Sequence, residues 1–291
     1  PPRRRKGLPV SGYLHYLRVC NAYNPADYRP WSISGMVIGH VRHAVAERLP
    51  EFGFRDTGDS LTLEPASFEA LSETLAKATD GLRTTGLAAP PRGELYPLLA
   101  HPDSAPLAAL DRGAATEFGI LNRGFHLNGI VRRVDGTFMW VARRARNKTT
   151  YPGKLDNMVA GGHPLGISPF DNLLKECHEE AGIPPEIAAT ARPTGTISYR
   201  MAVPAGLRRH MFYTYDLELD PDFVPQPLDG EVESFELMPI GQVMQIVETE
   251  PDAFKYNCNL AIIDFLIRQG FIGPDHPDYF EIVSGLRQPI F

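Results

Sequence analysis

The sequence has few cysteines and no long uninterrupted run of apolar residues. Its three cysteines, Cys20, Cys177 and Cys258, are odd in number, far apart and without a C-x-x-C spacing, which argues against a disulfide framework and favours free thiols in a reducing compartment. No segment offers the roughly 20 consecutive apolar residues that a membrane-spanning helix needs. The first residues, PPRRRKG, lack the apolar region of a signal peptide. We therefore expect a cytoplasmic protein with no membrane partner.

Basic residues are not in excess either. The chain has 29 Lys plus Arg against 35 Asp plus Glu, a net charge of -6, which has the wrong sign for a surface that coats nucleic acid. We therefore expect no nucleic-acid partner. The length of 291 residues with 43% hydrophobic residues is enough for one large domain or two medium ones. The oligomeric state stays open, with a homodimer as one option.

A cluster of proline and glycine between residues 88 and 106 separates two patterns along the chain. The earlier pattern predicts a small α+β unit, with helices near 14–21, 41–49 and 68–82, a strand over 31–40, and short strands near 52–55 and 61–63. After the cluster, residues 107–118 have helical spacing. Alternating apolar residues then predict strands over 125–134, 138–143, 197–203, 211–219 and 232–238, and two helices near 240–247 and 260–268. We predict an accessory domain, 1–117, and a mixed-sheet domain with packed helices, 118–291.

One helix between these strands has both ends marked in the sequence. In the segment GGHPLGISPFDNLLKECHEEAGIPP, Ser168 suits the N-cap, Pro169 the first helical position, and Gly182 the left-handed residue that ends a helix. At helical spacing, an apolar stripe should pack on the sheet; its members are Phe170, Leu173, Leu174, Cys177 and Ala181.

Three glutamates of this helix, Glu176, Glu179 and Glu180, are expected on a separate face. Carboxylates three and four residues apart repel one another, and two of them lie near the unfavourable C-terminal end of the helix dipole. A bound cation would offset this cost, and a tight group of hard oxygen ligands suits Mg²⁺ or Mn²⁺. The alternative is an ordinary solvated face with a Lys175–Glu179 pair. Gly161 and Gly162 lie just before the helix, where backbone N–H groups can approach a phosphate closely. A phosphate-binding loop beside the carboxylates favours the metal site over the solvated face.

The pattern G-x(13)-K-E-C-x-E-E-x-G-I, from Gly161 to Ile183, resembles the Nudix box, G-x5-E-x7-R-E-U-x-E-E-x-G-U with U apolar. The resemblance implies a Nudix α/β/α sandwich in which Glu176, Glu179 and Glu180 hold divalent metal and act on a diphosphate. There are two departures. The early glutamate of the box falls on Ile167, and its arginine falls on Lys175, which keeps the charge but lacks the planar fork that would clamp a neighbouring carboxylate.

The resemblance extends beyond the box. The stretch FGILNRGFHLNGIVRRVDGTFMWVARRARNKTTYPGKLDNMVAGG is similar to a subgroup of Nudix proteins that carry an extra N-terminal domain and are fused, in some fungi, to thiamine pyrophosphokinase. The segments 34–39 and 92–96 resemble the accessory domain of that subgroup. The resemblance implies hydrolysis of thiamine diphosphate, and preferentially of its oxidised analogues, to the monophosphate and phosphate.

Basic residues gather just before the two glycines in an otherwise acidic chain, which suits a site for phosphate oxygens. We select Arg143, Lys148 and Lys154, together with Gly161 and Gly162, as substrate-binding candidates; the alternative is a solvated basic loop. For four further side chains the sequence does not decide between a position in a cleft and one in the core; they are His126, Asn128, Trp140 and Tyr151.

A last acidic group lies in Asp229-Gly230-Glu231-Val232-Glu233. Many Nudix enzymes use a glutamate in this region as a metal ligand or base, and of Glu231 and Glu233 we favour Glu233 as catalytic. Three other functions stay open: hydrolysis of another nucleoside diphosphate derivative such as ADP-ribose, a non-catalytic ligand-sensing module, and an isopentenyl diphosphate isomerase-like enzyme. The isomerase would need a cysteine near residues 157–162, where this chain has Met158 instead.

Overall fold

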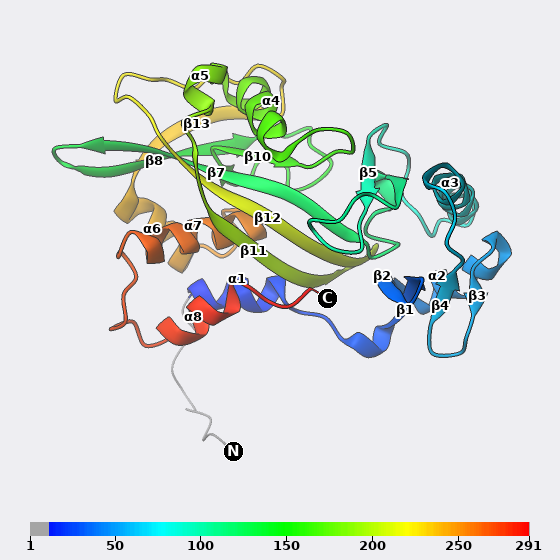
Figure 1. Cartoon of the computed structure of the whole chain (residues 1–291). Helices are drawn as coiled ribbons and strands as arrows, with labels where there is room; N and C mark the ends of the chain where they lie inside the picture. The colour runs from blue at the N-terminus through cyan, green and yellow to red at the C-terminus, as the bar shows by residue number, and fades with distance from the viewer. Residues whose placement is uncertain (1–11, 291) are drawn as a thin grey trace.

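The computed structural model describes residues 12–290 (Figure 1). The segment PPRRRKG, used above to judge the signal peptide, lies outside these residues. No helix within 12–290 is long and apolar enough to cross a membrane.

A seven-stranded mixed sheet organises the second part of the chain. Its strand order is β11-β12-β7-β8-β13, with β10 paired to β7 and β9 to β8. The strands are β7 (Leu121–Arg133), β8 (Gly136–Arg144), β9 (Leu155–Asn157), β10 (Val159–Gly162), β11 (Arg192–Val203), β12 (Gly206–Glu218) and β13 (Val232–Pro239). β7 and β12 run parallel, and the other pairs are antiparallel. All five strands predicted for this region are present.

Helices cover both faces of this sheet (Figure 1). One face carries α4 (Pro169–Ala181) and α5 (Pro185–Ala188), and the other carries α1 (Gly12–Cys20), α6 (Ile240–Thr249), α7 (Tyr256–Arg268) and α8 (Tyr279–Gly285). Each face has its own apolar cluster, so the second part of the chain is an α/β/α sandwich, as expected. Helix α1 comes first in the sequence but packs here, with Tyr13, Tyr16 and Cys20 buried among side chains of α6 and α7.

The N-terminal unit is a smaller α+β structure beside the sandwich. Its four-stranded sheet has the order β2-β1-β4-β3, and its apolar cluster is separate from those of the sandwich. The elements are the 3₁₀ helix η1 (Pro25–Asp27), β1 (Tyr28–Ile33), β2 (Met36–Arg42), α2 (His43–Ala46), η2 (Leu49–Phe52), β3 (Arg55–Asp56), β4 (Leu61–Leu63), α3 (Phe68–Thr84), β5 (Leu95–Leu98), β6 (Ala108–Asp111) and η3 (Arg112–Ala114).

Two predictions for this unit are wrong, and the strand expected near 52–55 is shifted, because Phe52 ends η2 and β3 covers only Arg55–Asp56. The single strand expected over 31–40 is a hairpin, because Ser34 (φ 51°) and Gly35 (φ 77°) adopt the left-handed conformation that a tight turn between strands requires. The helix expected over 107–118 is instead strand β6 followed by the short turn η3, because the backbone of β6 pairs with β5. That pairing depends on a segment about ten residues earlier in the chain, which local helical spacing does not reveal.

Candidate active site

The acidic helix α4 begins and ends where its sequence predicts. The Ser168 hydroxyl accepts a hydrogen bond from the Asp171 backbone N–H (3.0 Å), Pro169 occupies the first turn, and Gly182 ends the helix with φ 63°. These contacts satisfy backbone groups that a helix end leaves unpaired. The helix therefore has a fixed position against the sheet.

The faces of α4 differ from the prediction in two respects. Phe170 is 49% exposed and does not belong to the packing stripe. Asn172 takes the inward position of the first turn, where its amide donates to the Gly162 carbonyl oxygen (2.7 Å). Glu180 is only 8% exposed, because it lies two helical turns after the buried Leu173 and shares its face. The three glutamates therefore do not share one exposed face.

Glu180 points towards strand β10. Its Oε2 accepts a hydrogen bond from the Ala160 backbone N–H (3.0 Å). Burial, and then the negative charges of Glu176, Asp156 and Glu231, raise the pKa of Glu180 well above its ordinary value. This carboxyl group therefore lies close to three other carboxylates and accepts a hydrogen bond from one backbone N–H.

Glu176 and Glu179 contact the same ammonium group. Lys175 Nζ lies 3.1 Å from Glu176 Oε1 and 3.0 Å from Glu179 Oε2. Burial raises the pKa of Glu176 despite this neighbouring cation, and the carboxylates of Glu179 and Glu231 add to the effect. The side chain of Glu176 is 16% exposed and that of Glu179 is 45% exposed, so Glu176 belongs with Glu180 in the buried part of the site.

The two glycines of β10 are required by close approach of side chains. A Cβ atom at Gly161 would lie 2.8 Å from Glu176 Cγ, and one at Gly162 would lie 1.9 Å from the Tyr96 hydroxyl. Gly161 thus gives Glu176 its space, and Gly162 allows a residue of the N-terminal unit to reach the sandwich.

Of the two candidates in the last acidic group, the structure places Glu231 at the site. Glu231 lines the same cavity as Glu180, and its negative charge raises the pKa values of both Glu176 and Glu180. It forms an ion pair with Lys148. Glu233, which we favoured, pairs instead with Arg146 (3.4 Å) and is not among the residues that line the cavity.

These acids are the candidate metal ligands, but their carboxylate oxygens do not all lie within 4.8 Å of one another. The negative charge of Glu231 raises the pKa values of Glu176 and Glu180, that of Glu176 also raises the pKa of Glu180, and carboxylate oxygens are the donors that Mg²⁺ and Mn²⁺ prefer. A cation among them would remove the repulsion. Glu179 lies at the exposed edge, where it pairs with Lys175.

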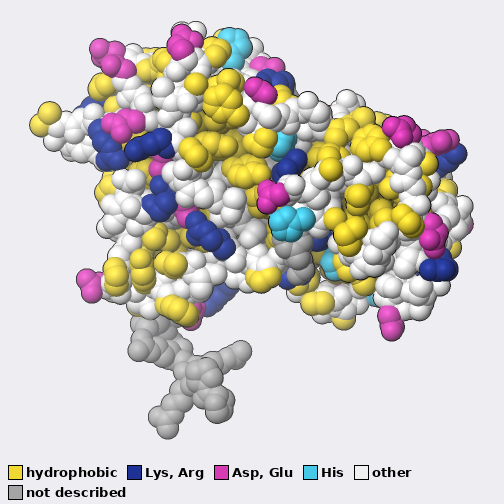
Figure 2. Space-filling view, viewed as in Figure 1, with side chains coloured by type: hydrophobic (Ala, Val, Ile, Leu, Met, Phe, Trp, Pro, Cys, Tyr) yellow, Lys and Arg dark blue, Asp and Glu magenta, His cyan; other side chains and the backbone are white. Residues whose placement is uncertain are grey.

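A cavity of about 720 Å³ lies between the N-terminal unit and the sandwich. The two units abut in the space-filling view, with the N-terminal unit at the right (Figure 2). The cationic side chains that line the cavity are Arg92, Arg112, Arg144, Lys148, Arg208 and Lys255; the carboxylates are Glu117, Glu180, Asp229 and Glu231. Both units contribute to each set.

The predicted phosphate-binding residues divide into two groups. Lys148, Gly161 and Gly162 line the cavity. Arg143 and Lys154 do not: Arg143 donates to the Gly153 carbonyl oxygen (3.1 Å), and Lys154 pairs with Asp252 (3.3 Å). Of the aromatic candidates, Tyr151 lines the cavity, whereas Trp140 is 8% exposed and packs in the core of the sandwich.

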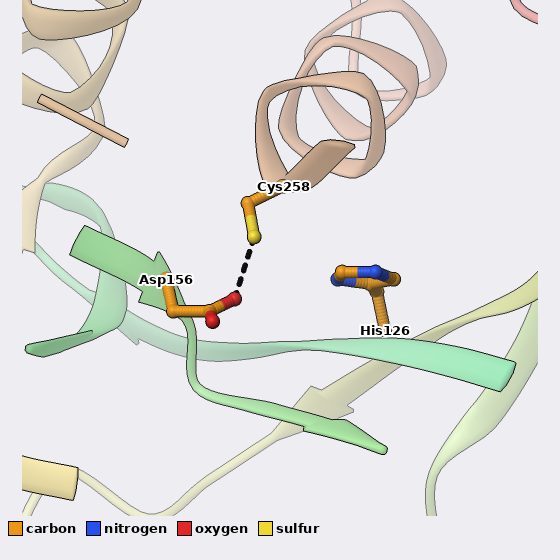
Figure 3. Close-up of side chains that lie close together, drawn as sticks. All are labelled: His126, Asp156 and Cys258. Atoms are coloured by element: carbon orange, nitrogen blue, oxygen red, sulfur yellow. Dashed lines mark hydrogen bonds between the residues drawn. The ribbon is translucent and has the colours of Figure 1, made fainter. Parts of the chain in front are cut away.

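A buried network adjoins the cavity, centred on Asp156 of β9 (Figure 3). Its Oδ1 accepts from the Cys258 thiol (2.5 Å), and its Oδ2 contacts Arg144 Nη1 (2.7 Å) and Lys255 Nζ (3.3 Å). Burial alone would raise the pKa of Asp156, but Lys255 and Arg144 lower it below its ordinary value. Asp156 thus positions two cations at the cavity.

His126, Asp156 and Cys258 lie close enough to hold a metal ion, with all three candidate atoms within 4.8 Å of one another. Their hydrogen bonds argue against one. His126 Nδ1 lies 2.8 Å from Asn157 Oδ1, and the Asn257 amide donates to His126 Nε2 (3.0 Å). Burial lowers the pKa of His126 to about 3, so it is neutral and both ring nitrogens are occupied. With Arg144 and Lys255 also present, this cluster is a hydrogen-bonded support.

Comparisons with known proteins agree with this geometry. The family model "NUDIX domain" matches residues 125–259, and "Domain of unknown function (DUF4743)" matches residues 12–122. Nudix hydrolase 20, chloroplastic, of Arabidopsis thaliana is 37% identical over 96% of this chain and 78% of its own length. The chain belongs to the Nudix hydrolase family.

Two further similar proteins are a second plant Nudix hydrolase and a solved Nudix domain. Nudix hydrolase 24, chloroplastic, of Arabidopsis thaliana is 36% identical over 96% of this chain and 78% of its own length. The Nudix domain of Shewanella oneidensis NrtR, solved with ADP ribose, covers 52% of this chain and 90% of its own at 12% identity, with a TM-score of 0.42. The match to the Nudix domain model and the two Arabidopsis relatives show that this chain is a Nudix pyrophosphohydrolase, an enzyme that acts on small-molecule substrates.

Proposed function

We propose that this Nudix hydrolase cleaves the diphosphate of thiamine diphosphate, and preferentially of its oxidised analogues, to the monophosphate and inorganic phosphate. The observation that carries the reaction is the cavity in which Glu180 and Glu231 lie together with Arg144, Lys148 and Lys255. The thiamine compound as substrate is supported by the sequence resemblance, which spans both units.

Within this proposal, Glu176, Glu179, Glu180 and Glu231 would hold Mg²⁺ or Mn²⁺. When bound, such a metal neutralises diphosphate charge and makes a coordinated water more acidic. Lys148 pairs with Glu231, so an ammonium group lies beside the carboxylates that would hold the metal and can contact a phosphate oxygen of the substrate.

The cations at the cavity serve the phosphate groups. Asp156 fixes Arg144 and Lys255 through direct contacts, so their N–H donors are oriented before a substrate arrives. Donors fixed in advance stabilise the developing negative charge without reorganisation during the reaction.

The charge of the cavity supports a preference for oxidised rings. Intact thiamine carries a positively charged thiazolium ring, whereas an oxidised ring is neutral. Cationic side chains outnumber carboxylates along the cavity wall, and bringing a further positive charge among them is costly. A neutral ring avoids that cost.

A substrate panel tests the proposal. Catalytic efficiencies would be measured in Mg²⁺, with and without chelator, for thiamine diphosphate, its ring-oxidised analogue, ADP-ribose, a nucleoside triphosphate and a dinucleotide, with identification of products. We expect the oxidised thiamine compound to lead and to yield monophosphate plus phosphate. If ADP-ribose or the dinucleotide leads, the thiamine assignment is wrong while the Nudix chemistry stands.

The isomerase alternative is disfavoured by the cysteines. Met158 occupies the place where that enzyme would need one, and it is fully buried against Gly129. All three cysteines are buried. Burial raises the pKa of Cys258 well above its ordinary value and also raises that of Cys177, which leaves little thiolate or accessible thiol for acid–base chemistry.

A further inference from the structure

Two side chains on the wall of the cavity have buried polar atoms without hydrogen-bond partners. Glu117 is 3% exposed and Asn122 is 9% exposed, and both line the cavity. Within residues 12–290, Glu117 Oε2 and Asn122 Oδ1 contact no donor. Buried polar atoms are normally paired, so atoms that face a cavity unpaired mark a place where a ligand completes the hydrogen bonds.

The orientation of Glu117 is fixed by its other oxygen. Glu117 Oε1 accepts a hydrogen bond from the Ala89 backbone N–H (3.0 Å). The carboxyl group is therefore held in place by the N-terminal unit, and its Oε2 is buried at the cavity wall without a hydrogen-bond partner. Asn122, the second residue of β7, presents its acceptor from the sandwich.

Strand β7 relates these acceptors to the acidic site. The cavity is lined along β7 from Asn122 to His126, and His126 pairs with Ala160, whose N–H binds Glu180. Four residues of extended strand span about 13 Å. Asn122 therefore lies about that far along β7 from the residue that pairs with Ala160, a span suited to two parts of one small molecule.

We propose that Glu117 and Asn122 form a recognition subsite that accepts hydrogen bonds from the N–H edge of the substrate's heteroaromatic ring, such as an exocyclic amino group. The proposal rests on the proposed function, since it assigns the diphosphate to the acidic site. Aromatic side chains are available around the ring: Tyr96, Phe125 and Tyr151 also line the cavity. The ring is thereby read by residues of both units.

The variant Glu117→Gln tests this subsite sharply. Its amide oxygen would keep the bond from the Ala89 N–H, so the NH₂ group takes the place of Oε2 and a donor replaces an acceptor. The probes are two compounds that differ only in one ring substituent: thiamine diphosphate and its analogue with a carbonyl oxygen in place of the exocyclic amino group. We expect the ratio of kcat/KM for the oxo compound over the amino compound to rise roughly tenfold or more, mainly through KM.

This ratio separates recognition from structural damage. A folding defect lowers kcat/KM for both compounds by the same factor, so the ratio stays unchanged. A change in the contacts at the ring edge affects the two compounds differently and therefore changes the ratio. Glu51→Gln, an exposed glutamate of the same unit that pairs with Arg48, is the matched control and should leave the ratio unchanged. If Glu117→Gln does not fold, Asn122→Ala is measured instead, with loss of discrimination between the two rings as the expected result.

The test also distinguishes failure of the thiamine assignment from failure of the proposed subsite. If thiamine compounds are not hydrolysed but ADP-ribose is, the same comparison is made with ADP-ribose and its hypoxanthine counterpart, which exchanges an amino group for a carbonyl. A raised oxo-to-amino ratio in either pair supports the subsite. An unchanged ratio in a folded Glu117→Gln enzyme overturns it, whichever substrate is used.

Discussion

Asp156 and Glu180 are both buried carboxylates, yet their surroundings shift their pKa values in opposite directions. Asp156 contacts two cations, and its pKa is lowered. Glu180 receives a single backbone N–H and is surrounded by further acids, so burial raises its pKa. A buried carboxylate without a partner is unfavourable as an anion. The difference identifies Asp156 as an internally neutralised support and Glu180 as the group that needs an external cation.

This contrast predicts the effect of Glu180→Gln. The variant keeps the shape of the side chain but removes the charge that would hold a metal, so we expect turnover to fall by roughly a thousandfold or more. The fold should stay intact, and the metal-free protein should be slightly more stable because repulsion is relieved. Phosphate release in Mg²⁺ and thermal unfolding measure the two effects. Glu186→Gln, an exposed glutamate on α5, is the control, and near wild-type turnover of Glu180→Gln would contradict the metal site.

Asp156→Asn should instead affect stability. It leaves Arg144 and Lys255 without their shared counter-charge, and breaking a buried ion pair by removing one partner costs about 3–5 kcal/mol. Urea unfolding measures the loss. Asp252→Asn removes an 86% exposed carboxylate that pairs with Lys154 and should cost less than about 1 kcal/mol. Equal stability of the two variants would show that Asp156 is not the support inferred here.

His126 gives the stability a pH dependence. Burial lowers its pKa from 6.5 to about 3, so between these values the unfolded chain binds a proton that the native protein does not. Its contribution is complete above pH 6.5 and is lost as the pH falls towards 3. We expect His126→Gln to lose less stability than wild type over this window, by about 1.4 kcal/mol for each pH unit. The measurement is denaturant unfolding of both proteins at pH 7, 6 and 5. If this assignment is wrong, the free energy of unfolding will change with pH equally in wild type and His126→Gln.

At the scale of elements, helix α4 was predictable because its boundaries depend on its own residues. Ser168, Pro169 and Gly182 fix the ends through local contacts. The inward direction of Glu180 was not predictable, because it depends on the Ala160 N–H of β10. Helical spacing gives angles around one axis, but only the position of the neighbouring strand decides which angle faces the core.

The buried network around Asp156 could not be predicted from local sequence patterns either, because it too depends on contacts between distant segments. Asp156 and Lys255 lie 99 residues apart, and no spacing in the sequence announces their contact. It was equally difficult to predict which of Glu231 and Glu233 faces the cavity. Glu231 directly precedes strand β13, and Glu233 is its second residue. A bulge in the pairing of β13 with β8 between Val232 and Ser234 interrupts the alternation that would be used to assign their faces.

The loop-to-helix arrangement yields a prediction at Gly161. A methyl group there would lie 2.8 Å from Glu176 Cγ, so Gly161→Ala must displace the Glu176 side chain. We expect kcat in Mg²⁺ to fall about tenfold or more, since small displacements of catalytic groups are costly, with a modest loss of thermal stability because the new Cβ would also lie 3.0 Å from the buried Phe125 ring. Gly241→Ala, where no atom lies within 4 Å of the new Cβ, is the control. Unchanged kcat for Gly161→Ala would show that the close approach has no role in positioning Glu176.

At the scale of the whole molecule, the shape of the cavity depends on the relative position of the N-terminal unit and the sandwich. Tyr96 reaches Gly162 from the N-terminal unit, and the Trp31 indole donates to the Phe118 carbonyl oxygen (2.8 Å) in the connection between the units. Residues of the predicted accessory domain form part of the cavity wall. Substrate selection can therefore change if the relation between the units changes, even when α4 is intact.

Arg209 on β12 joins three segments that are far apart in the sequence. It is 1% exposed, and its guanidinium donates to the carbonyl oxygens of Ile38 (2.7 Å), Gly119 (3.1 Å) and Ile290 (2.8 Å). Burial lowers its pKa to about 10, so it stays charged at neutral pH. One planar cation thus links the N-terminal sheet, the connection to β7 and the C-terminal segment.

Arg209→Lys keeps the charge but cannot serve these three carbonyls at once, because an ammonium on a flexible chain lacks the guanidinium's fixed fork of donors. Each hydrogen bond to a charged group contributes about 1.5–3 kcal/mol, so losing two should lower the free energy of unfolding by about 3 kcal/mol or more. The N-terminal unit should then unfold before the sandwich, and KM should rise because the cavity needs both units. Calorimetry and steady-state kinetics measure these effects, with Arg192→Lys at an exposed position of β11 as control. A single transition at the wild-type Tm would show that the units are held together by their apolar contacts alone.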